Sequence, residues 1–245
     1  MAEHGNGGGL EHPTWLHFLY VKHILPEWLP EMVPVTWLVI VILSVTVVIA
    51  SRRLSVRNPS RFQVSLEFCV SSLDGFVHNI VGEHSKRLTP VIGTFFIFIL
   101  SLNLFGLIPG FISPTKDINT TVSLALFAFL FVQVYAIYAR GIVNYVKHFL
   151  GEPIWLAGLM LPIHIIGELA RPLSLSIRLF GNIFGEETVI AILVMIVTGV
   201  LGNMLIPLQF PMMLFAIFGS LVQALVFSML VSIYIAVAVT GHEEH

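Results

Sequence analysis

The chain has 245 residues, of which 56% are hydrophobic and only 11% are charged, with a formal net charge of -2 and a mean hydropathy of +0.92. This composition excludes an ordinary soluble globular domain and predicts an all-α, multi-pass membrane protein. A single cysteine excludes an internal disulfide framework. The sequence contains no P-loop, HExxH or Rossmann pattern, so we expect no cofactor, no metal and no nucleic-acid partner.

The N-terminal part predicts an outer segment followed by the first membrane span. Residues 1–32 have a Gly-rich start and several histidines, but no basic region of the kind that begins a cleaved signal peptide. Residues 33–50 carry no charge and are long enough to cross a bilayer as a helix. They end at Arg52 and Arg53, which indicates that this end of the span faces the cytoplasm.

Residues 60–84 have the spacing of an amphipathic helix. Apolar residues recur at intervals of three and four, which predicts a helix on the cytoplasmic membrane surface or packed against the bundle. These residues are Phe62, Leu66, Cys69, Leu73, Phe76 and Ile80.

Two further spans are expected at residues 88–112 and 120–139, joined by an outer loop. Of the 12 Lys and Arg residues, eight flank the ends of spans that would then face inward. This charge distribution predicts an N-terminus outside the membrane and a C-terminus in the cytoplasm. The eight are Arg52, Arg53, Arg57, Arg61, Lys86, Arg87, Arg140 and Lys147.

Residues 150–241 are expected to form a long helical hairpin that brings the total to about five passes in a single membrane domain. The first arm, to about residue 196, is too long and too interrupted for one upright helix, so it must tilt, kink or oligomerise. A turn is expected at Gly202 and Asn203, and the second arm is interrupted near Pro207 and Pro211.

The most informative residue of this hairpin is Arg178, because a guanidinium inside a membrane span is costly and stays protonated. Arg171, Ser174, Arg178 and Asn182 follow one another at intervals of three or four, which predicts a polar, basic stripe along one helical face. Glu187 lies nine positions beyond Arg178, about half a turn around an ideal helix, so it should line a different cavity.

Two polar groups of the hairpin allow both a structural and a functional interpretation. His164 and Glu168 are four residues apart on one face, with Arg171 three further on. They form either a local hydrogen-bonded group or the lining of an inner path. Gln223, alone in an apolar helix, usually indicates contact between helices.

The charged centre of the hairpin leaves three classes of protein open. An ion-conducting subunit would use Arg178 as a fixed charge. A secondary transporter or channel could bind an anion there, although no second copy of the motif indicates an internal repeat. A purely structural assembly subunit would give no reason for Arg178, Asn182 and Glu187 to lie together.

The motif Pro172–Asn182, reading PLSLSIRLFGN, resembles subunit a of the F-type ATP synthase. Similar likenesses occur at Asn103–Gly110, at the outer loop Pro114–Thr121, and at Gln223 followed by Ala224. The resemblance runs from about residue 33 to the C-terminus. It implies a non-catalytic proton-translocating subunit of a bacterial inner membrane, with the c-ring, stator subunit b and the remainder of the F1F0 complex as partners.

Carried over by position, the resemblance assigns the essential charge to Arg178 and the proton path to Glu187, Asn182, Gln223, Glu168 and His164. It implies two aqueous half-channels that meet the c-ring carboxylate on either side of Arg178. The sequence departs from the family at two positions, with His164 where a glutamate is frequent and Ala216 where some members have a histidine. The binding carboxylate lies on another chain, so H+ and Na+ both stay open as coupling ion.

Overall fold

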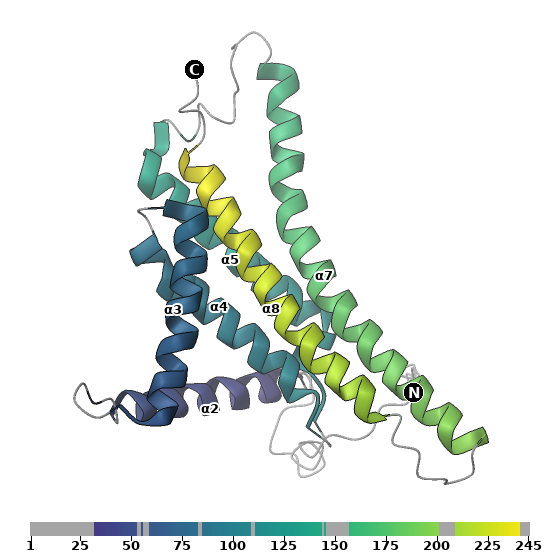
Figure 1. Ribbon diagram of the computed structural model, residues 1–245. Coiled ribbons are helices and arrows are strands. Elements are labelled where there is room, and N and C mark those ends of the chain that lie inside the picture. The colour runs from purple at the N-terminus through teal and green to yellow at the C-terminus, as the bar shows by residue number, and fades with distance from the viewer. Residues whose placement is uncertain are drawn as a thin grey trace.

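The protein is described by a computed structural model, which covers residues 32–240 except 53–54, 56–58, 83–84, 109–110, 144, 146–156 and 201–208. The regular elements of this part are all helical (Figure 1). They are α2 (Met32–Arg52), α3 (Arg61–Val81), α4 (Ser85–Phe105), the 3-10 turn η2 (Pro114–Lys116), α5 (Ile118–Arg140), α7 (Ala157–Val200) and α8 (Gln209–Thr240). The expected N-terminal segment, the turn at Gly202 and Asn203, and the C-terminal tail lie outside the described residues.

Four of these helices are long and apolar enough to cross a membrane: α2, α4, α5 and residues 210–239 of α8. The all-helical, multi-pass class predicted from composition is therefore confirmed. The helix α7 carries five charged residues, from Glu168 to Glu187.

The core lies where α4, α5, α7 and α8 meet, and small residues allow the helices to approach closely. Ala125 and Ala128 of α5 and Ala224 of α8 are almost fully buried. Phe95 and Phe227 fill the space between α4 and α8, with ring centroids 5.8 Å apart. Small residues at helix contacts are the usual solution in membranes, where dispersion forces replace the hydrophobic effect.

The helix α3 runs almost at right angles to α2 in Figure 1 and lies along α4 and α8. It begins at Ser60, whose hydroxyl accepts a hydrogen bond from the Gln63 amide in the manner of an N-cap. The expected apolar stripe packs only in its C-terminal half, where Leu73 is buried. Its N-terminal half, with Leu66 and Cys69, is exposed within this chain, because α4 and α8 do not extend over it.

The first arm of the hairpin is a single oblique helix, in agreement with the expectation that it would not be an upright one. The helix α7 is continuous over 44 residues and contains both Pro162 and Pro172. At 1.5 Å per residue it is roughly 66 Å long, about twice the hydrocarbon thickness, so it can only cross obliquely. In Figure 1, α7 and α8 run side by side and obliquely to α2.

Arg140, the last residue of α5, forms hydrogen bonds to the C-terminal end of α8. Its Nε donates to the carbonyl of Val239 at 3.3 Å, and Nη2 donates to the carbonyl of Val237 at 3.2 Å. These carbonyls have no partner inside the helix, and the positive charge also suits the negative end of the helix dipole. The neighbouring ends of α5 and α8 are thereby held together.

Candidate functional site in the α7–α8 pair

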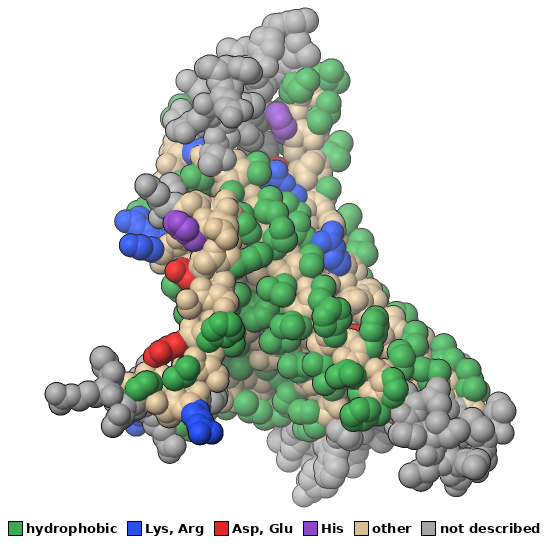
Figure 2. All heavy atoms as spheres, in the orientation of Figure 1, with side chains coloured by type: hydrophobic (Ala, Val, Ile, Leu, Met, Phe, Trp, Pro, Cys, Tyr) green, Lys and Arg blue, Asp and Glu red, His purple; other side chains and the backbone are tan. Residues whose placement is uncertain are grey.

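Arg178 lies near the middle of α7, on the exposed surface of this helix. Within the described residues its guanidinium makes no ion pair and no hydrogen bond. The surrounding surface over α7 and α8 is largely apolar, as the space-filling view shows (Figure 2). Its exposed side chains include Leu173, Ile177, Leu214, Phe215, Phe218 and Leu221. A permanent charge therefore lies unpaired among apolar side chains.

Two glycines follow Arg178 on the exposed part of α7. A β-carbon added at Gly181 or at Gly185 would meet no atom of the described chain within 4 Å. The small residues are thus not required by packing inside this chain. Glycines four residues apart make a shallow groove that permits close approach of another helix.

Asn182 and Glu186 lie where α7 approaches α8 most closely. A β-carbon added at Gly219 of α8 would lie 3.3 Å from Oε2 of Glu186 and 3.9 Å from Nδ2 of Asn182. Gln223 follows Gly219 by four residues, on the same face of α8, and is 6% exposed. Its amide makes no hydrogen bond within the described residues. Ala216, where some relatives of the motif have histidine, is fully buried.

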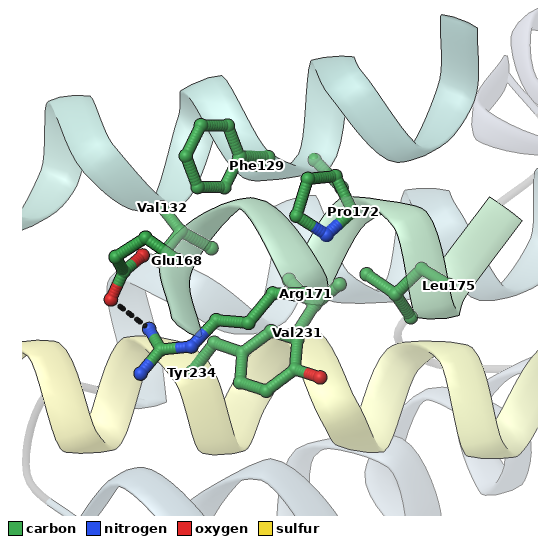
Figure 3. A pocket seen from close by; sticks show the side chains of 9 residues that line it. Phe129, Val132, Glu168, Arg171, Pro172, Leu175, Val231 and Tyr234 are labelled. Atoms are coloured by element: carbon green, nitrogen blue, oxygen red, sulfur yellow. Dashed lines mark ion pairs between the residues drawn. The ribbon is translucent and has the colours of Figure 1, made fainter. Parts of the chain in front are cut away.

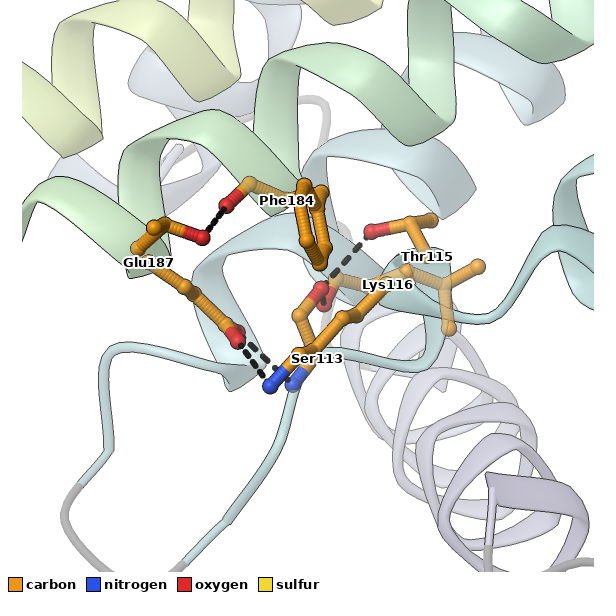
Figure 4. Close-up of polar contacts among 7 residues, drawn as sticks. Ser113, Thr115, Lys116, Phe184 and Glu187 are labelled. Atoms are coloured by element: carbon orange, nitrogen blue, oxygen red, sulfur yellow. Dashed lines mark hydrogen bonds and ion pairs between the residues drawn. The ribbon is translucent and has the colours of Figure 1, made fainter. Parts of the chain in front are cut away.

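Glu187 points away from Arg178 and toward the outer loop, as its position on the helix predicted. Its Oε2 lies 3.2 Å from Nζ of Lys116, and its Oε1 accepts a long hydrogen bond of 3.4 Å from the Ser113 amide (Figure 4). Both side chains of the ion pair are about one quarter exposed. Glu187 is therefore accessible from the loop side of the molecule.

A chain of hydrogen bonds leads from this loop into the bundle. The hydroxyls of Ser113 and Thr115 are 2.7 Å apart, and Thr115 donates to Oδ1 of Asn103 at 2.8 Å. All three side chains are buried, and Nδ2 of Asn103 has no partner in the described part of the chain. An unpartnered buried amide requires explanation, and a bound water is one explanation.

A second polar group occupies the junction of α5, α7 and α8, toward the end of the molecule where α5 and α8 finish. Oε1 of Glu168 lies 2.7 Å from Nη1 of Arg171, and Oε2 accepts a hydrogen bond of 2.7 Å from Gln133 of α5. The Arg171 guanidinium lies over the ring of Tyr234 from α8, 5.0 Å from its centroid (Figure 3). Glu168, Arg171 and Tyr234 line a small pocket together with Pro172.

Tyr145, just beyond α5, extends this group. Its hydroxyl donates to Oε1 of Gln133 at 2.6 Å, which orients the Gln133 amide so that its NH2 faces Glu168. Burial raises the pKa of the Tyr145 phenol, Glu168 raises it further, and Arg171 acts in the opposite direction. The phenol therefore stays protonated and acts as a donor.

The structure separates the predicted site residues into three groups. Asn182 is exposed on α7 beside Gly219 of α8, and Gln223 lies one turn beyond Gly219. Glu187 lies at the outer loop, and Glu168 lies in the inner group. His164, half-buried, lies one turn before Glu168 on α7. Arg178 and Arg171, expected on one stripe, differ in environment: Arg178 is exposed and unpaired in the described part, whereas Arg171 is paired.

Several residues of these groups were missed by sequence reasoning. Lys116, Gln133 and Tyr234 contact Glu187, Glu168 and Arg171 only through tertiary structure, and Tyr145 contacts Gln133. Gln133 had a visible signal, because it is an amide within an otherwise uncharged span. The described residues contain no group of three or more His, Cys, Asp or Glu that could hold a metal.

Fold and site define a class: a polytopic helical membrane protein with an uncompensated arginine on the surface of a long, oblique helix pair. A family model described as ATP synthase A chain matches residues 33–236. "ATP synthase subunit a" of Trichlorobacter lovleyi is 43% identical over 229 residues, covering 91% of this chain and 96% of the relative. "ATP synthase subunit a 1" of Hahella chejuensis is 40% identical over 228 residues, covering 93% of this chain and 89% of the relative. "ATP synthase subunit a" of Oleidesulfovibrio alaskensis is 46% identical over 177 residues, 72% of each chain.

The chain belongs to the ATP synthase subunit a family. Its apolar helices and these relatives identify it as a multi-pass protein of a bacterial membrane.

Proposed function

We propose that the chain is the proton-translocating subunit a of the F0 sector, which couples proton flow to rotation of a c-ring and so to ATP synthesis. In this proposal it catalyses no bond chemistry itself. Its partners are the c-ring, stator subunit b and the rest of the F1F0 complex. The supporting family match extends over residues 33–236 and therefore includes every proposed site residue.

The observation that carries the proposal is the environment of Arg178. The guanidinium has no partner within the described residues and is exposed among apolar side chains. Such a charge is stable in a membrane only beside water or beside an opposite charge on another chain. A c-ring carboxylate supplies that opposite charge.

The fixed charge gives Arg178 two effects. It stabilises the ionised form of an approaching carboxylate, which favours release of the carboxylate's proton. It also repels protons that would otherwise pass directly from one half-channel to the other. Each charge that crosses the full membrane potential is worth about 2.3 kcal/mol per 100 mV, and a direct leak would dissipate this energy.

For the outer half-channel we propose a path that begins at Glu187 and continues past Asn182 and Gln223. The support is that Glu187 is accessible from the outer loop and that Gln223 carries a buried amide without a partner in the described chain. Glu187 transfers protons, whereas the two amides orient water or the arginine. Asn103 extends the polar lining on the loop side, because its unpartnered Nδ2 is suited to hold a water molecule.

For the inner half-channel we propose His164 as a lining residue. Glu168 was the second candidate, but its ion pair with Arg171 favours an electrostatic role over proton transfer. The proposed orientation has the N-terminus outside and the C-terminus in the cytoplasm. Support for it comes from Lys86 and Arg87 at the start of α4 and Arg140 at the end of α5, which lie toward the same end of the bundle, the end that would then face inward (Figure 1).

The alternative of an anion transporter with its site at Arg178 receives no support from the comparisons. All the relatives described above are named as ATP synthase subunit a.

The proposal is tested in membrane vesicles that contain the whole complex, by replacing Arg178 with Ala and with Lys. ATP-driven proton pumping is measured with a pH-sensitive dye, and assembly is followed by the amount of membrane-bound ATPase. We expect Arg178→Ala to abolish pumping while the complex still assembles. Pumping close to the wild-type rate in an assembled Arg178→Ala complex would contradict the proposal.

A further inference from the structure

The two arginines of α7 are seven residues apart, so an ideal helix would place them about 10 Å apart on nearly the same side. The structure gives them different environments. Arg178 is exposed and has no partner in the described part of the chain. The Arg171 guanidinium instead lies over Tyr234 of α8, with Nη1 2.7 Å from Oε1 of Glu168.

Residues outside the Arg171–Glu168 ion pair also fix its position. Gln133 of α5 donates to Oε2 of Glu168 at 2.7 Å, and Tyr145 donates to Gln133 at 2.6 Å. The side chains of Arg171 and Glu168 are 27% and 17% exposed, so water screens their charges less than on an open surface. Three elements thus fix the position of one carboxylate.

Pro172 adds a backbone reason for the placement of this group. A proline has no N–H, so the carbonyl of Glu168, four residues earlier, cannot accept its usual helical hydrogen bond. Glu168, Arg171 and Pro172 line one pocket together. The proline thus removes one backbone donor from α7 next to the Glu168–Arg171 ion pair.

We infer that Glu168, held by Gln133 and Tyr145, is a positioning residue that neutralises Arg171 and turns it toward α8, leaving Arg178 as the uncompensated arginine of α7. The inference rests on the proposed function of Arg178 and extends it. A second free charge on the same helix would stabilise the ionised c-ring carboxylate over a longer arc. The carboxylate would then lose its proton, or fail to regain it, at the wrong point of rotation.

The charged and titratable groups that face Arg171 determine how a substitution changes the electrostatic environment of its guanidinium. From α7 the facing group is Glu168, from α8 it is Tyr234, and α5 contributes the neutral Gln133 with Tyr145 behind it. Replacing Glu168 with Gln preserves the shape and removes the one carboxylate that pairs with Arg171. The positive charge of Arg171 then acts without compensation.

The experiment compares Glu168→Gln, Arg171→Gln and the double variant in vesicles that contain the whole complex. We expect Glu168→Gln to move the pH optimum of ATP-driven pumping toward acid by up to about one unit, because a free charge about 10 Å farther along α7 lowers the carboxylate pKa. Loading that carboxylate then needs a higher proton concentration. The double variant lacks both charges of the inner ion pair and leaves Arg178 as the uncompensated arginine, so its optimum should return to within about 0.3 units of the wild-type value.

The control is Glu67→Gln, which removes one negative charge from exposed α3 and should leave the optimum unchanged. An unshifted optimum in Glu168→Gln would overturn the inference. So would an impaired double variant, because that result would make Glu168 itself a proton carrier. If the Glu168→Gln complex does not assemble, the double variant tests the inference alone. A pH optimum within about 0.3 units of the wild-type value supports the inference, and impaired pumping contradicts it. None of these outcomes changes the result expected for pumping by the Arg178→Ala complex. Failure of this inference is therefore distinguishable from failure of the proposed function.

Discussion

The charged side chains near the two ends of α7 and the one in its middle differ in whether they have a partner. Toward one end Arg171 is paired with Glu168 at 2.7 Å, and toward the other Glu187 is paired with Lys116 at 3.2 Å. Between them Arg178 has no acidic partner in the described part of the chain. Within the described residues, α7 therefore has both of its ion pairs where it contacts other elements and gives the exposed Arg178 no such partner.

This difference indicates which charges serve the fold and which serve a partner. The paired groups contact neighbouring elements of the same chain, namely α5 and α8 at the inner group and η2 at the outer loop. An unpaired cation in an apolar surface costs free energy for the isolated chain. In the proposed function this cost is offset by water and by a carboxylate of the c-ring, so the middle of α7 is the proposed contact with the ring.

The largest effect is expected from filling the groove that Gly181 and Gly185 form beside Arg178, which tests the difference between the middle and the ends of α7. Gly181→Leu adds a side chain that meets no atom of the described chain at its first carbon, so the subunit should fold. A ring helix packed against this groove would be displaced, and we expect ATP-driven pumping to disappear while the subunit is still inserted in the membrane. Pumping and subunit content are measured in the same vesicles.

The matched control for this variant is Gly75→Leu on α3, where the glycine is also exposed and an added carbon is also unobstructed. This change should leave pumping intact. Equal pumping in Gly181→Leu and Gly75→Leu would show that no helix approaches the middle of α7 closely.

Glu187→Gln removes the titratable group at the outer end and should slow pumping by about 100-fold, which is the size typical of losing a positioned proton-transfer group. Gln keeps the hydrogen bond from the Ser113 amide, so the loop should stay in place. Glu187→Asp retains a carboxylate and should recover part of the rate. If Gln and Asp were equally active, Glu187 would be a structural anchor of the loop.

Lys116→Gln breaks the same ion pair from the other side and should have the smallest effect. A pair whose side chains are about one quarter exposed contributes less than about 1 kcal/mol. We expect a change in pumping of less than about fivefold and a small decrease in the melting temperature of the purified complex. An effect as large as that of Glu187→Gln would mean that Lys116 takes part in proton entry.

Much of the fold follows from the sequence because it depends on local properties. Hydropathy and length locate α2, α4, α5 and α8, and the helical period places Glu187 away from Arg178. The continuity of α7 through Pro162 and Pro172 was not predictable in this way. A proline removes one backbone hydrogen bond, but packing against α5 and α8 decides whether the helix breaks.

The contacts between helices also required the structure. Periodicity predicts that Glu168 and Arg171 share a side of α7, but not that Gln133, 35 residues earlier, donates to Glu168. The approach of Glu186 to Gly219 depends on how α8 is aligned against α7. The sequence could mark these residues as polar or small, whereas their partners depend on the register between helices.

The most direct test of the central claim is the passive proton permeability of vesicles stripped of F1, under an imposed membrane potential. The account has Arg178 as the electrostatic barrier between two half-channels. It predicts that Arg178→Ala conducts protons faster than the wild type, whereas Arg171→Gln combined with Glu168→Gln does not. An Arg178→Ala sector that is present in the membrane but no more permeable than the wild type would contradict this account.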